Sequence, residues 1–96
     1  MMATAAEKLI SLVTECLSSG SSKLPADIRD DAAWRARMKE AVSGDPKAQE
    51  AVDAACDVVL LSAADGESKQ NVYRECARET LRMLGQSPDI IPAVAG

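Results

Sequence analysis

Apolar residues recur at helical spacing in four stretches of the chain, and the longest stretch covers residues 46–64. Asp45 is a suitable N-cap for it, and Pro46 suits the first position of a helix. The Asp65-Gly66 pair ends the stretch, because glycine readily takes the left-handed conformation that follows a helix. We expect this helix to be central in the fold. Its apolar face is expected to comprise Ala48, Ala51, Val52, Ala55, Val58, Val59 and Ala63.

The polar face of this helix is acidic at first and then disappears. Glu50, Asp53 and Asp57 form a stripe opposite the apolar face, and Leu60 and Leu61 then occupy the same angular positions. A helix that is apolar on all sides is usually covered on all sides. We therefore expect the two leucines to be covered either by the tail or by a second copy of the chain in a homodimer. The tail residues concerned are Ile90, Ile91 and Val94.

Capping signals and apolar periodicity predict three further helices. The four helices are expected over about 5–18, 32–43, 46–64 and 69–84, with a short helical turn at 26–29. Their expected N-caps are Thr4, Asp30 or Asp31, Asp45 and Ser68. Short connections favour antiparallel neighbours. The fold class is therefore all-α: residues 1–96 form a single small four-helix bundle, with an irregular proline-containing tail over 86–96.

Two side-chain patterns indicate how these helices pack. Trp34 is the largest side chain in a core of small ones, so we expect it to anchor the second helix; on the surface it would be a candidate hot spot for a partner. Arg74, Arg78 and Arg82 follow one another at four-residue spacing on the last helix. This arginine row is an expected partner for the acidic stripe. Within the last helix we expect the ion pairs Glu75–Arg78 and Glu79–Arg82.

Composition and charge narrow the functional classes. The chain has no Phe, one Trp and one Tyr, so its apolar residues are mainly small aliphatics that suit helix packing. A net charge of −4 argues against direct nucleic-acid binding, which normally needs a basic surface. No segment has the roughly 20 apolar residues needed to span a membrane. The N-terminal residues also lack the pattern of a secretory signal, so we expect a cytoplasmic protein.

The inventory of reactive residues does not indicate an enzyme. There is no His, which removes every Ser-His, Cys-His and His-metal arrangement. Cys16, Cys56 and Cys76 lie on three different predicted helices, each on or near an apolar face. We expect them to be reduced thiols that pack as small hydrophobic side chains. We assign no catalytic residue, no metal ligand and no cofactor.

Acidic residues are concentrated in one part of the chain. Between residues 40 and 67 there are seven acidic side chains and one lysine. Such a region is either a solvated helix face or a docking surface for a basic protein. The first alternative is the default for exposed charge.

The segment Ala63-Ala64-Asp65-Gly66-Glu67, at the end of one helix and before the next, resembles the helix junction of TerB-like tellurite-resistance domains. Those domains are all-helical and use acidic residues near that junction to bind metal. The resemblance is confined to this junction, and Glu75 lies later than the family pattern places its next acidic residue. It makes Asp65 and Glu67 metal-ligand candidates and supplies an alternative function, an acidic metal-binding stress domain.

The sequence favours a small acidic, non-catalytic protein-binding module, an adaptor or inhibitor of a partner protein. A phage- or plasmid-borne inhibitor would fit the size and acidity, although no residue identifies that origin. The expected partner is another protein, with a basic surface or in the form of a second copy of the chain, and neither nucleic acid nor a membrane. The candidate binding residues are Trp34, Glu50, Asp53, Asp57, Leu60 and Leu61.

Overall fold

The computed structural model describes residues 4–17, 30–63, 66 and 68–91. In order, its elements are α1 (Ala5–Cys16), α2 (Asp31–Ala41), α3 (Pro46–Ser62), α4 (Lys69–Met83) and the 3₁₀ turn η2 (Pro88–Ile90). The predicted all-α class is confirmed, and each helix ends one or two residues before its predicted end. The turn expected at 26–29 lies outside the described residues. In the described part of the chain, no helix is both long and apolar enough to cross a bilayer.

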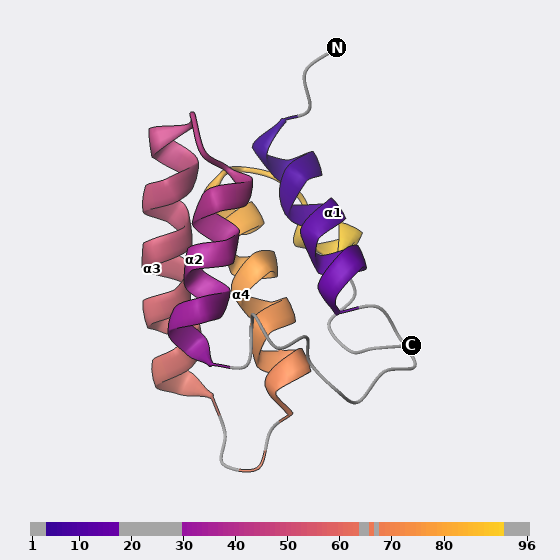
Figure 1. Ribbon diagram of the computed structural model, residues 1–96, viewed down its shortest axis with the longest axis vertical. Coiled ribbons are helices and arrows are strands. Elements are labelled where there is room, and N and C mark those ends of the chain that lie inside the picture. The colour runs from indigo at the N-terminus through magenta and orange to yellow at the C-terminus, as the bar shows by residue number, and fades with distance from the viewer. Residues whose placement is uncertain (1–3, 18–29, 64–65, 67, 92–96) are drawn as a thin grey trace.

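Successive helices run in opposite directions and form one bundle (Figure 1). α3 packs against α2 and α4, whereas α4 contacts α1, α2, α3 and η2. The longest helix is α3, as predicted. The element that contacts all the others is α4, although α3 was expected to be central. The reason is visible in the burial of α4, whose buried residues are Val72, Tyr73, Arg74, Cys76, Ala77, Thr80 and Leu81.

Side-chain caps start the helices at the predicted positions. The Thr4 hydroxyl accepts a hydrogen bond from the Glu7 amide at 3.1 Å, and the Asp30 carboxylate accepts one from the Ala33 amide at 2.7 Å. Each satisfies a backbone donor that has no partner inside its helix. Asp30, rather than Asp31, is therefore the cap of α2. The caps of α3 and α4 are Asp45 and Ser68, as predicted.

Trp34 anchors α2 to α4 in the centre of the core. Its side chain is 1% exposed, and its ring stacks on Tyr73 with centroids 5.5 Å apart and an interplanar angle of 17°. The indole Nε1 donates a hydrogen bond to the Tyr73 carbonyl at 3.1 Å. The anchoring prediction is confirmed. Trp34 consequently has no surface to offer a partner in this fold, which corrects its place among the candidate binding residues.

The arginine row of α4 does not face the acidic stripe of α3. Arg74 is 3% exposed and donates to the Leu17 carbonyl at the end of α1. Arg78 donates to the Pro88 carbonyl at 3.1 Å and to the Ile91 carbonyl. These two arginines satisfy backbone carbonyls of other segments, a use that helical spacing alone does not reveal. Both expected ion pairs within α4 are present: Glu79 pairs with Arg82, and Glu75 pairs with Arg78 at 3.2 Å.

The described part of the tail packs on α4. Ile91 is 1% exposed, whereas Ile90 is 54% exposed. The expectation that the tail docks on the bundle holds for Ile91, which packs in the core beside α4. Val94 lies outside the described residues.

The Trp34 anchor yields a stability prediction. Trp34→Ala should lower the free energy of unfolding by about 3–5 kcal/mol, because it removes a fully buried ring and leaves a cavity. Trp34→Phe is the matched control: it keeps an aromatic ring beside Tyr73 and should cost clearly less. Denaturant unfolding measures both variants. An alanine variant that melts within a degree or two of the wild type would contradict the anchor.

Candidate functional site

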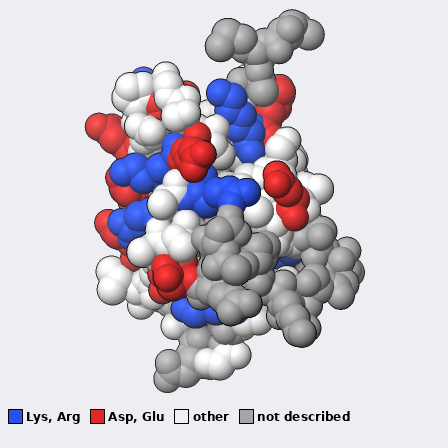
Figure 2. All heavy atoms as spheres, viewed as in Figure 1, with Lys and Arg blue, Asp and Glu red and all other residues white. Residues whose placement is uncertain are grey.

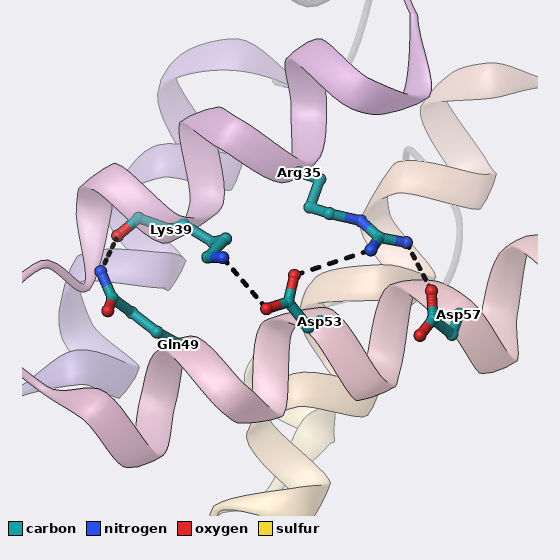
Figure 3. A network of polar contacts seen from close by, with 5 residues as sticks. All are labelled: Arg35, Lys39, Gln49, Asp53 and Asp57. Atoms are coloured by element: carbon teal, nitrogen blue, oxygen red, sulfur yellow. Dashed lines mark hydrogen bonds and ion pairs between the residues drawn. The ribbon is translucent and has the colours of Figure 1, made fainter.

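Charged side chains of α2 and α3 form a network across the seam between the two helices (Figure 3). The Arg35 guanidinium lies 2.7 Å from the Asp57 carboxylate and 3.6 Å from that of Asp53. Lys39 Nζ lies 3.0 Å from Asp53. The Gln49 side chain donates to the Lys39 carbonyl at 3.3 Å. The acidic stripe is therefore paired with α2, not with the arginines of α4 as the sequence suggested.

This pairing reduces the negative charge that the acidic stripe can offer to a partner. Arg35 and Lys39 balance the charge of Asp53 and Asp57 within the chain, and Figure 2 shows basic and acidic side chains alternating over the α2–α3 side. Glu50, one turn earlier, is exposed. Partly exposed pairs of this kind contribute at most about 1 kcal/mol each, so they set the register of α2 on α3 more than they stabilise it.

The C-terminal end of α3 leaves large apolar side chains uncovered. Leu61 is 88% exposed and Val58 is 52% exposed, whereas Leu60 packs partly against the core. Val58 was predicted to be buried, but it lies at the margin of a buried face that follows Val52 and Cys56. The described tail residues pack against α4 and leave Leu61 uncovered. The predicted outward orientation is therefore confirmed for Leu61.

An open groove of about 400 Å³ lies between α2 and this end of α3. Its lining residues are Asp31, Ala32, Arg35, Ala36, Lys39 and Leu60. The alanines of α2 face Leu60 with short side chains, and this leaves space that a larger residue would fill. The groove thus has apolar walls and a charged rim of both signs. We call the groove together with Val58 and Leu61 the α3-end surface.

Asp31 closes the groove at the first turn of α2. Its carboxylate accepts hydrogen bonds from the Tyr73 hydroxyl at 2.9 Å and from Lys69 Nζ at 3.0 Å. Lys69 also lies 5.8 Å from the centre of the Tyr73 ring. Burial opposes the ionised form of Asp31, but the hydrogen bonds from Lys69 and Tyr73 outweigh it and lower the pKa of Asp31 below its ordinary 3.8.

Sequence reasoning found the leucines but missed the groove. The four-residue spacing of Arg35 and Lys39 matches that of Asp53 and Asp57 on an antiparallel neighbour. That match was a usable signal. The space beside Leu60 depends on which alanines of α2 face it, and this could be known only after the register was set.

The alternative of a metal-binding domain finds no site among the residues that the structure describes. Among them, no three His, Cys, Asp or Glu side chains lie together as a metal-binding group. The junction residues Asp65 and Glu67 lie outside the described part. Comparison with known proteins gave no match to a family model, a curated protein or a solved structure. The candidate site therefore rests on its own geometry.

The Asp31 contacts yield a prediction for the effect of pH on stability. Because folding lowers the pKa of Asp31, its contribution is present above about pH 4 and is lost as pH falls through the lowered pKa. The free energy of unfolding should therefore fall less steeply below pH 4 in Asp31→Asn than in the wild type. Glu50→Gln, which removes an exposed carboxylate, is the control and should follow the wild-type profile. Parallel profiles for all three proteins would contradict the role given to Asp31.

Proposed function

We propose that the protein is a small non-catalytic protein-binding module, an adaptor or inhibitor, and that it binds through the α3-end surface. The observation that carries this proposal is the 88% exposure of Leu61 directly after Leu60, which lines the groove. Exposed apolar patches rimmed by polar residues are typical of interaction sites.

The form of the surface supports a helical partner. An amphipathic helix binds by laying its apolar residues into a groove, with its polar residues at the rim. Here the apolar walls are Ala32, Ala36 and Leu60, and the rim carries Asp31 and Lys39. Leu61 adds an apolar contact outside the groove. Binding of this kind needs no reactive group.

The partner that this surface suits first is a second copy of the chain. In a two-fold arrangement the same patch is used on both copies, so it must complement itself. Leu61 of one copy can fill the space beside Leu60 of the other, because an exposed leucine and an alanine-walled groove lie on the same end of α3. The rim also carries both signs of charge. A strongly basic partner is less favoured, since Asp53 and Asp57 are already paired with α2.

Leu61→Asp tests this proposal by sedimentation at tens of micromolar protein. We expect the wild type to sediment at twice the 10.1 kDa monomer mass. The variant should weaken self-association by about tenfold or more, because it places a charge where an apolar side chain would be buried against the other copy. It should remain folded, since Leu61 is 88% exposed. Ile90→Asp is the matched control: Ile90 is a 54% exposed aliphatic residue on η2, and its substitution should leave the dimer intact.

A second variant examines the groove itself. Ala36→Leu should fill part of the space beside Leu60 and weaken self-association without loss of helix, because leucine is a good helix former. If the wild type sediments as a single 10.1 kDa species, the second copy is not the partner. If the wild type is dimeric and both variants remain so, the interface lies elsewhere and the α3-end surface is not the binding site.

A further inference from the structure

The first residues of α2 and α4 form an ion pair at the end of the bundle where α3 stops (Figure 1). Asp31 begins α2 and Lys69 begins α4, and Lys69 Nζ lies 3.0 Å from the Asp31 carboxylate. The Asp31 side chain is 41% exposed and that of Lys69 is 55% exposed. Asp31 also lines the groove together with Leu60. The pair is therefore partly solvated and borders the α3-end surface.

Lysine is an unfavourable choice for the first residue of a helix. The N-terminal end of the helix dipole is positive and favours an acidic side chain there. Glu7 and Asp31 follow this preference in the first turns of α1 and α2, whereas α4 has no acidic residue in its first turn. A residue that opposes a local preference is expected to gain through another contact. Asp31 supplies one such contact to Lys69, and the exposed part of the lysine leaves room for a second.

An ion pair that lies beside a two-fold axis can complement its own copy. If the axis is perpendicular to the line joining the two charges, rotation turns the second pair end for end, and each cation then faces the anion of the other copy. In the dimer proposed above, Leu61 of one copy lies beside Leu60 of the other, so the axis passes close to this end of α3. Asp31 and Lys69 lie at the same end and hence near the axis.

We propose that Asp31 and Lys69 are specificity-determining residues of the dimer and that they pair with Lys69 and Asp31 of the second copy in a cluster of alternating charge. This inference rests on the proposed self-association through the α3-end surface. The leucines bury apolar area against any apolar partner, whereas the charges favour a second copy of the chain. Charges at the rim of an interface commonly select the partner in this way.

Two charge reversals test the cross-pairing. Lys69→Asp gives each copy two anions at this position, and Asp31→Lys gives each copy two cations. Each variant should self-associate about tenfold or more weakly than the wild type, because like charges then meet across the axis. An equimolar mixture of the two should form a heterodimer, because the cations of one copy face the anions of the other. Sedimentation at tens of micromolar protein measures all three samples, and far-UV circular dichroism checks that each variant is helical.

The double variant, with both Asp31→Lys and Lys69→Asp, restores opposite charges and should dimerise like the wild type. It takes the place of the mixture if Asp31→Lys alone does not fold. Lys69→Asp itself should remain folded, because an acidic residue suits the start of a helix. Lys47→Asp is the matched control: Lys47 is an exposed lysine in the first turn of α3, at the opposite end of that helix from Leu61, and its reversal changes the net charge equally. It should leave the dimer intact.

The outcomes distinguish this inference from the function on which it rests. A monomeric wild type would overturn both. A wild-type dimer that Leu61→Asp disrupts, but that Lys69→Asp weakens no more than Lys47→Asp does, would overturn the role of the ion pair and leave the α3-end surface as the interface. Weakening by Lys69→Asp that neither the mixture nor the double variant reverses would overturn the cross-pairing in the same way.

Discussion

The stack of Trp34 on Tyr73 is the contact on which the rest of the arrangement depends. α2 has little else to bury: its other fully buried side chain is Met38, followed by Val42 just beyond its end. A hydrogen bond from the indole to the Tyr73 backbone fixes the position of α2 along α4 as well as its distance from it. An aromatic pair of this kind adds specific geometry to the area that it buries. The position of every other α2 side chain follows from this one.

The charged and apolar surfaces follow from that position. Once Trp34 faces α4, Arg35 and Lys39 lie over α3, with Arg35 level with Asp57 and Lys39 level with Asp53 (Figure 3). Ala32 and Ala36 of α2 then lie beside Leu60, and their short side chains leave the groove open. One core contact therefore sets both the ion pairs and the groove.

Much of the fold could be predicted from the sequence because local signals agreed with each other. The capping residues Thr4, Asp45 and Ser68 begin the predicted helices, and Trp34 is buried as its size and setting indicated. The roles of Arg74 and Arg78 could not be predicted, since they donate to carbonyls of segments far from them in sequence. The exposure of Val58 could not be predicted either, because it depends on how wide the buried face of α3 is. Helical periodicity gives the centre of a buried face, but its width depends on the neighbouring helices.

The most direct test of this account is the fluorescence of Trp34, the only tryptophan of the chain. The measurement compares its emission and its quenching by acrylamide in native and denatured protein, in a solution dilute enough that chains do not associate. A side chain that is 1% exposed and bonded to the Tyr73 carbonyl should emit at shorter wavelength in the native protein and be strongly protected from the quencher. Native emission and quenching equal to those of the denatured chain would contradict the account, because α2 would then not be anchored to α4 within a single chain.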